Sequence, residues 1–195
     1  MTDFKLRFLL PRIISWRRFF SRCLLLLACL FILGMPPALA GMNDDNYEGN
    51  VFIIYGGNGS LVPAKLTLAE ALAEHKPTVM VFYVDDSSDC KKYSIYLSTV
   101  QAFYGRVTEI IPVNVDAIPV KDSYEPSEPG YYYKGAVPQV VVFNQEGKVV
   151  LDKIGQVPYE DIDDQLRIVF NLLPRSESVE LKRRSFNEIS TELTK

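Results

Sequence analysis

The chain has 195 residues, a formal net charge of −3 and three cysteines with a single histidine. Without a targeting segment, the remaining length is enough for one domain with its own hydrophobic core. So few cysteines and histidines exclude a disulfide-stapled fold and leave no cluster with metal-ligand spacing, so we expect neither a metal nor another cofactor.

Residues 1–40 have the pattern of an export signal. Six basic residues precede an apolar run over 23–35, and Ala38-Leu39-Ala40 has the small-x-small form of a signal-peptidase site. This run is shorter than the roughly 20 residues of a usual membrane span, which favours a cleaved signal peptide over an N-terminal membrane anchor. Trp16-Arg17-Arg18 also fits a twin-arginine signal, so the export route stays open.

The exported part, residues 41–195, is acidic. Its net charge is −8, because the leader contains six of the 21 basic and one of the 24 acidic residues. We therefore expect no nucleic-acid binding. We also expect little affinity for anionic lipid head groups, so membrane association is predicted only through residues 1–40 if they stay uncleaved.

The first elements after the leader are a linker, a strand and a helix. Residues 41–50 are polar and indicate a linker, whereas 51–55 are β-branched and aromatic, which predicts a strand. Thr67 and Glu70 stand in capping-box spacing, so a helix is predicted over 68–75.

A buried strand and a long helix follow. Residues 78–84 form a continuous apolar run, as in a central strand covered on both faces. Ser87 or Ser88 can then cap a helix over 89–104.

The second half predicts three more strands and a last helix. A strand over 107–115 contains Pro112, which implies a bulge or a bend. A Pro- and Tyr-rich insert, 116–135, separates it from a hairpin of strands 139–143 and 148–154.

The hairpin leads into a final helix over 159–173, and a charged tail follows over 174–195. The order is β-α-β-α-β, then β-β-α. It predicts an α/β fold with a central mixed sheet flanked by helices.

Three segments resemble the thioredoxin-like superfamily, over residues 51–173 in all. They are the strand–turn–helix junction 84–90, the Gly-Ala-Val-Pro segment 135–138 and the hairpin at 143–148. The resemblance implies a thioredoxin-like fold in which the Val137–Pro138 bond is cis and faces the turn before Cys90.

The sequence departs from that family where the family's chemistry lies. Cys90 occupies the second cysteine position of the Cys-x-x-Cys motif, but Ser87 occupies the first, which holds the nucleophile in thioredoxins. Three neighbouring aspartates disfavour a thiolate at Cys90, and Val81 replaces the buried acid of most thioredoxins. The nucleophile and the proton carrier of dithiol exchange are therefore both missing.

More narrowly, the segment 84–90 and the tyrosine-rich insert resemble the cyanobacterial photosystem I accumulation factors of the thylakoid membrane. The resemblance implies an accessory protein that binds client subunits and assists accumulation or assembly of photosystem I. It also implies a thylakoid location, on the lumenal or periplasmic side. The alternative is an enzyme, a monothiol oxidoreductase or redox relay acting through Cys90; a redox-inert chaperone with broad clients is a third interpretation.

The candidate site residues each have a structural alternative. Cys90 is the candidate thiol, and the alternative is that it is an inert core residue. The predicted partner-binding residues are Ser87, Ser88, Val137, Pro138, Tyr131 and Tyr132. The proline can be a scaffold feature instead of a groove floor for an extended client. The tyrosines can fold over the sheet edge instead of forming an interface.

Overall fold

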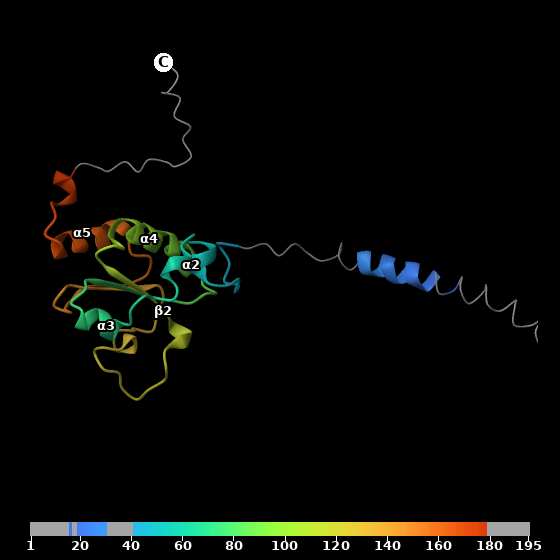
Figure 1. Ribbon diagram of the computed structural model, residues 1–195, viewed down its shortest axis with the longest axis horizontal. Helices are drawn as coiled ribbons and strands as arrows, with labels where there is room; N and C mark the ends of the chain where they lie inside the picture. The colour runs from blue at the N-terminus through green and yellow to red at the C-terminus, as the bar shows by residue number, and fades with distance from the viewer. Residues whose placement is uncertain (1–15, 17–18, 31–40, 179–195) are drawn as a thin grey trace, which may run out of the picture. The chain divides into compact units, whose positions relative to one another are not determined.

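The computed structural model describes Trp16, residues 19–30 and residues 41–178 (Figure 1). The chain divides into two units, Met1–Ala40 and Gly41–Lys195, and each is described by itself. In the first unit, residues 19–30 form a helix with exposed side chains. In the described parts of the chain, no helix combines the length and apolarity needed to cross a membrane. The predicted cleavage site at Ala40 and the tail beyond residue 178 lie outside the described residues.

The second unit is built on a four-stranded mixed sheet with the strand order β2-β1-β3-β4. Strand β1 runs parallel to β2 and antiparallel to β3, and β3 is antiparallel to β4. The strands are β1 (Thr78–Tyr83), β2 (Glu109–Asn114), β3 (Gln139–Phe143) and β4 (Val149–Ile154). The predicted mixed α/β fold is confirmed.

Helices cover both faces of the sheet (Figure 1). One face packs α2 (Val51–Ile54), α4 (Ser88–Tyr104) and α5 (Tyr159–Val169) against alternate residues of β1, including Val79 and Val81. The other face packs α3 (Leu68–Ala73) and part of the insert against Met80 and Phe82. Successive side chains of a strand point to opposite faces, so an apolar run without alternation gives β1 two buried faces.

The capping box predicted before α3 is present in full. The hydroxyl of Thr67 accepts a hydrogen bond from the backbone N–H of Glu70, and the Glu70 carboxylate accepts one from the backbone N–H of Thr67. Two free amides of the first turn are thereby satisfied, which fixes where this short helix begins.

Residues 51–55 do not form the predicted first strand. They form the short helix α2, in which the side chain of Asn50 accepts a hydrogen bond from the N–H of Phe52. Val51 and Phe52 are fully buried on the α4 side of the sheet. Burial of these two side chains overrides their preference for extended backbone. The described sheet thus has β2 at its edge.

Pro112 lies in this edge strand without the predicted bulge. The register between β1 and β2 is continuous, with Val81 opposite Pro112. Glu109 donates its N–H to the carbonyl of Pro77, and alternation along a parallel strand then turns the nitrogen of Pro112 away from β1. An edge strand tolerates proline there because no sheet hydrogen bond is lost.

Residues 41–50 are irregular, but they do not form a free linker as predicted. The fully buried ammonium of Lys91 donates to the carbonyls of Gly41 and Asp44 at 3.0 Å each, and to the Asp44 carboxylate at 2.9 Å. The N–H of Gly41 in turn donates to Oε1 of Glu48 at 2.9 Å. We call residues 41–50 the strap, because Lys91 holds this segment against the start of α4.

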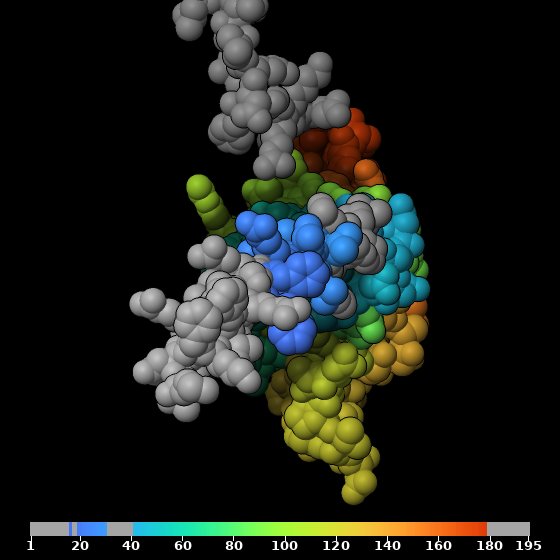
Figure 2. Space-filling view, turned by 90° about the vertical axis from the view of Figure 1, so that its right-hand side faces the viewer, coloured from blue at the N-terminus to red at the C-terminus, as the bar shows by residue number. Residues whose placement is uncertain are grey.

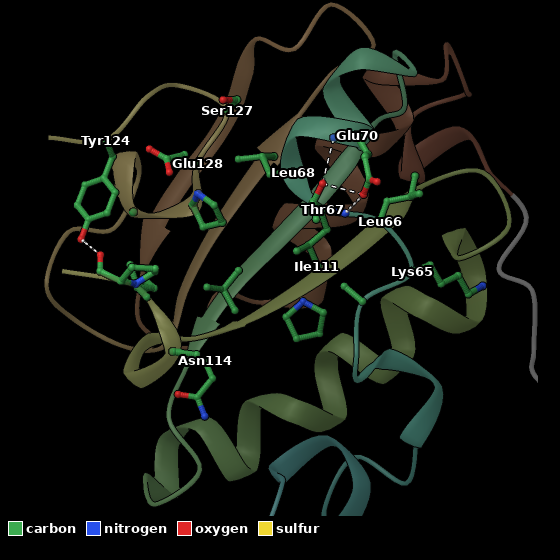
Figure 3. Close-up of a pocket in the computed structure, with 18 residues that line it drawn as sticks. Lys65, Leu66, Thr67, Leu68, Glu70, Ile111, Asn114, Tyr124, Ser127 and Glu128 are labelled. Atoms are coloured by element: carbon green, nitrogen blue, oxygen red, sulfur yellow. Dashed lines mark hydrogen bonds between the residues drawn. The ribbon is translucent and has the colours of Figure 1, made fainter. Parts of the chain in front are cut away.

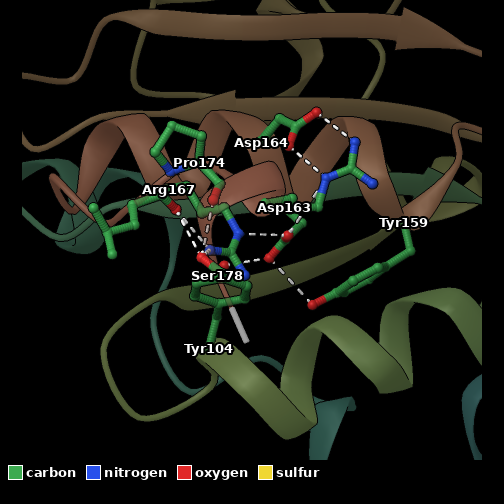
Figure 4. A network of polar contacts seen from close by, with 9 residues as sticks. Tyr104, Tyr159, Asp163, Asp164, Arg167, Pro174 and Ser178 are labelled. Carbon is green, nitrogen blue, oxygen red and sulfur yellow. Dashed lines mark hydrogen bonds and ion pairs between the residues drawn. The ribbon is translucent and has the colours of Figure 1, made fainter. Parts of the chain in front are cut away.

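Helix α5 ends at Val169, four residues before the predicted end, and a polar network fixes the chain beyond it (Figure 4). Asp163, which is almost fully buried, accepts hydrogen bonds from Tyr104 and from Arg167. Arg167 also donates to the carbonyl of Leu173 and to the hydroxyl of Ser178. The start of the predicted tail is therefore bound to the domain.

Candidate functional site

The turn that precedes α4 keeps its helix cap but not its redox pair. Ser87 is the N-cap residue, and its hydroxyl accepts a hydrogen bond from the N–H of Cys90 at 3.3 Å. Serine is a preferred N-cap residue, so it starts the helix well where a thioredoxin has its nucleophilic cysteine. Within residues 41–178, Cys90 is the only cysteine, and it is unpaired.

Cys90 is buried, with 1% of its surface exposed. Burial raises the pKa of its thiol, and the carboxylates of Asp89 and Asp85 raise it further. The thiolate is the form that attacks disulfides, so both effects work against reactivity. The geometry therefore favours an inert core thiol at Cys90 over a reactive one.

Asp85 joins three elements around the turn. Its carboxylate accepts hydrogen bonds from the N–H of Val51 at 3.0 Å and from the side-chain amide of Asn114 at 3.0 Å. Burial raises the pKa of Asp85, while those two hydrogen bonds lower it. Asp85 therefore ties the end of β1 to α2 and to the end of β2, and it acts as a structural link.

Val137 and Pro138 lie at the same end of the sheet as the turn. The bond between them is cis, Pro138 is buried, and its carbonyl accepts a hydrogen bond from the N–H of Gly155 at 2.7 Å. Val137 packs against the same core cluster that contains Cys90. The structure therefore brings Val137 close to Cys90, although the two residues are 47 positions apart in the sequence.

The backbone of Val137 is left available. Among residues 41–178, neither its N–H nor its C=O has a hydrogen-bond partner. A half-buried backbone segment with both groups free can accept an extended peptide as an added strand.

The two predicted serines are already engaged. Ser87 caps α4, and the N–H of Ser88 donates to the carboxylate of Asp45 in the strap at 2.8 Å. A client that used the Ser88 amide would have to displace Asp45. The partner-binding role of both serines stays a prediction.

The tyrosines of the insert divide into two kinds. Tyr132 meets the ring of Phe143 edge-on at 4.9 Å, and its hydroxyl donates to the carbonyl of Pro126. Tyr133 packs on Phe82 at 5.3 Å. Tyr131, by contrast, is 55% exposed. Tyr132 and Tyr133 thus fold over the sheet, and Tyr131 alone of the three presents its ring to solvent.

The insert also forms one wall of a cleft of about 450 Å³ (Figure 3). Residues of β2 and α3 also line it, including Ile111, Val113 and Leu68. The wall formed by the insert contains Tyr124, whose hydroxyl donates to the carbonyl of Pro119. Neither Val137 nor Tyr131 lines it. Sequence reasoning missed this cleft; the Pro- and Tyr-rich composition of 116–135 was its one signal.

In the described residues, no group of three or more histidine, cysteine, aspartate or glutamate side chains could hold a metal ion. The candidate site around the turn consists of a capped helix start, a buried thiol and a free backbone segment. Such a site is suited to binding a polypeptide.

Comparison with known proteins gives one long sequence match. The thylakoid membrane protein slr1796 of Synechocystis sp. is 51% identical over 156 residues, which span 80% of this chain and 78% of that protein. No protein-family model matches the chain.

Solved structures with a similar fold are distant in sequence. A mutant thioredoxin from Halobacterium salinarum is 17% identical, with a TM-score of 0.41 and coverage of 53% of this chain and 83% of its own. A yeast mitochondrial 1-Cys peroxiredoxin is 16% identical, with a TM-score of 0.41 and coverage of 57% and 97%.

Proposed function

Because the chain belongs to the family of the Synechocystis thylakoid membrane protein slr1796, we propose that it is a thylakoid accessory protein that binds client polypeptides without exchanging disulfides. Its client is a subunit of a membrane complex, photosystem I, whose accumulation or assembly it assists. The domain works on the lumenal or periplasmic side of the membrane.

The chemistry of the turn carries this proposal. An intramolecular disulfide needs two sulfurs, and the described part of the second unit has Cys90 alone, buried and with a raised pKa. Ser87 fills the other position and serves as a helix cap. Thioredoxin-type catalysis would need a thiolate at that position.

The binding surface is the free backbone of Val137 next to this turn. An extended client segment pairs with the N–H and C=O of Val137, in the manner of an added β-strand. Tyr131 lies in the segment that leads to Val137, and its exposed ring can close over the client. A tyrosine suits this task, because a broad apolar ring ends in a polar hydroxyl.

The choice of photosystem I rests on the resemblance of residues 84–90 and of the insert to the accumulation factors. It is tested in a deletion strain, in which photosystem I and photosystem II are measured separately. We expect loss of photosystem I with photosystem II retained, restored by the wild-type chain. Equal loss of both, or no loss, would overturn the assignment.

The site is tested by photo-crosslinking in the full-length protein. A crosslinking amino acid at Tyr131 should capture a photosystem I subunit, and the same amino acid at Val149, an exposed position on β4, should not. Insulin reduction separates the proposal from the monothiol enzyme: we expect no turnover. Thioredoxin-like turnover that Cys90→Ser abolishes would establish the enzyme instead.

A further inference from the structure

The free backbone of Val137 lies beside the turn that follows β1. The sheet order is β2-β1-β3, so this turn lies between the end of β2 and the segment that leads into β3. The pairing of Phe82 with Gln139 brings the end of β1 level with Val137, and the pairing of Tyr83 with Asn114 brings it level with the end of β2. Residues that follow β1 and β2 therefore surround the backbone that can take an added strand.

These surrounding segments carry carboxylates. The strap contributes Asp45, the turn contributes Asp85 and Asp86, α4 contributes Asp89, and the insert begins with Asp116. Figure 2 shows the strap, in cyan, and the insert, in yellow-green, on one face of the second unit. Within the described residues, none of these aspartates forms an ion pair. The domain's own basic side chains therefore do not neutralise them.

Three of these carboxylates already have hydrogen-bond partners. Asp85 links α2 to the end of β2. Asp45 accepts the N–H of Ser88, and Asp89 accepts a hydrogen bond from the side chain of Gln156 at 2.8 Å. Asp45 and Asp89 also lie at the positive end of the α4 dipole, which offsets roughly half an elementary charge.

Asp86 and Asp116 remain free to meet a ligand. Both are exposed, and in the described part of the chain neither carboxylate accepts a hydrogen bond or forms an ion pair. Burial is the main reason that the pKa of Asp85 is raised, and the charges of Asp86 and Asp116 raise it further. The two exposed charges thus lie close enough to the turn to act on the same place.

The basic residues near the site are mostly engaged elsewhere. Lys91 is fully buried and donates to the strap. Lys134, three residues before Val137, pairs with Asp152 at 2.8 Å. Lys92 lies one turn into α4 and forms no ion pair with the described aspartates. Negative charge therefore exceeds positive charge around Val137.

This excess of charge decides which polypeptides suit the site. When an extended peptide is added as a strand, main-chain hydrogen bonds provide affinity and the alternating side chains provide selectivity. Opposite charges across such a contact attract, and like charges repel. Lysine and arginine side chains are long enough to reach exposed carboxylates on either side of the bound backbone.

We propose that the site at Val137 selects extended client segments rich in lysine or arginine, and that Asp86 and Asp116 set this preference. The inference rests on the proposed function and narrows the client to a polypeptide with a basic extended segment. An acidic segment is repelled from the same backbone.

The test uses the full-length protein and three synthetic peptides of equal length. Each alternates threonine with one other residue, which is lysine, glutamine or glutamate, and carries the same uncharged dye for fluorescence anisotropy. An exposed charge pair changes affinity by up to about fivefold. With two free aspartates in reach, the lysine peptide should bind at least about fivefold more tightly than the glutamine peptide, and the glutamate peptide should bind most weakly. This order should disappear in about 1 M salt, which screens charges beyond roughly 3 Å.

Paired variants separate the site from the overall acidity of the domain. Asp86→Asn with Asp116→Asn removes two negative charges beside Val137 and should abolish the preference for lysine. Asp122→Asn with Glu177→Gln removes two charges from other exposed positions and should keep it. A photo-crosslinker at the centre of the lysine peptide should label residues 135–139.

Equal binding of the three peptides, an equal effect of the two variant pairs, or crosslinking elsewhere would overturn this inference. Those results would leave the photosystem phenotype and the Tyr131 crosslink untouched. If none of the peptides binds, the binding role of Val137 itself is wrong, and the site in the proposed function falls with it.

Discussion

Replacing Lys91 with methionine should destabilise the domain and release its strap. Lys91→Met keeps the length of the side chain but removes an ammonium group that has no exposed surface and donates three hydrogen bonds at 2.9–3.0 Å. The ammonium also lies 5.3 Å from the ring of Tyr55. The substitution leaves three acceptors of the strap without their donor.

The expected cost follows from these contacts. A hydrogen bond to a charged group contributes about 1.5–3 kcal/mol. Water can reach part of the strap, and the variant no longer has to desolvate an ammonium, so the net loss for Lys91 is about 2–3 kcal/mol rather than the sum of three bonds. At about 2–4 °C per kcal/mol for a chain of this size, Tm should fall by about 4–12 °C.

Urea unfolding followed by circular dichroism measures this loss, and hydrogen exchange measures the strap. In Lys91→Met, the amides of residues 41–50 should lose protection under conditions in which the rest of the domain stays folded. Lys148→Met is the control, because Lys148 is 76% exposed and pairs only with the exposed Glu146. It should change neither quantity. Wild-type stability in Lys91→Met, or lost stability with full protection of residues 41–50, would refute the role assigned to Lys91.

Three further predictions concern the thiol, the insert and pH. Native Cys90 should react with a thiol reagent far more slowly than a free thiol in solution, because it is buried and its pKa is raised; equal rates would contradict this. Tyr132→Ser should lower the free energy of unfolding by about 2–4 kcal/mol through lost core packing. Tyr131→Ser should leave Tm unchanged and weaken client capture. Lost stability in Tyr131→Ser with wild-type stability in Tyr132→Ser would contradict the roles assigned to the two rings. The pKa values of Asp44 and Glu70 are lowered by hydrogen bonds, so their contribution is present above the unfolded carboxyl pKa of about 4 and is lost as pH falls below it. The raised pKa of Cys90 acts in the other direction, so stability should also fall as pH rises past the unfolded thiol value of about 8.5. Unfolding free energies measured across this range check both limits, and a flat profile would contradict them.

Much of the fold could be predicted because several local signals agreed with the tertiary structure. The apolar run at 78–84 gave the central strand, and the capping box at Thr67 gave the start of α3. The strand predicted over 51–55 was wrong, because the β-propensity of these residue types reflects how they pack on a pleated, half-buried sheet and does not fix the backbone by itself. Here Asn50 caps a turn of helix, and the core packing of Val51 and Phe52 decides the outcome.

The site could be predicted only in part. Cys90 and Val137 were singled out from a motif, and the structure places both in one core cluster. The strap could not be foreseen, since its polar sequence matches that of a linker and the decisive partner, Lys91, lies some 50 residues away along the chain. A lysine after the motif looks like a surface charge; its complete burial depends on acceptors that only the folded chain assembles.

The contact between Gly41 and Glu48 means that the predicted cleavage after Ala40 would change the stability of the domain. In the uncleaved chain the donor is a neutral peptide N–H, 2.9 Å from Oε1 of Glu48. Cutting after Ala40 would turn that nitrogen into a free amine, which is positively charged below a pH of about 8. The new chain end would then face a carboxylate already in place. Maturation would thereby exchange an ordinary hydrogen bond for an ionic one, so a domain that starts at Gly41 would melt higher than its precursor.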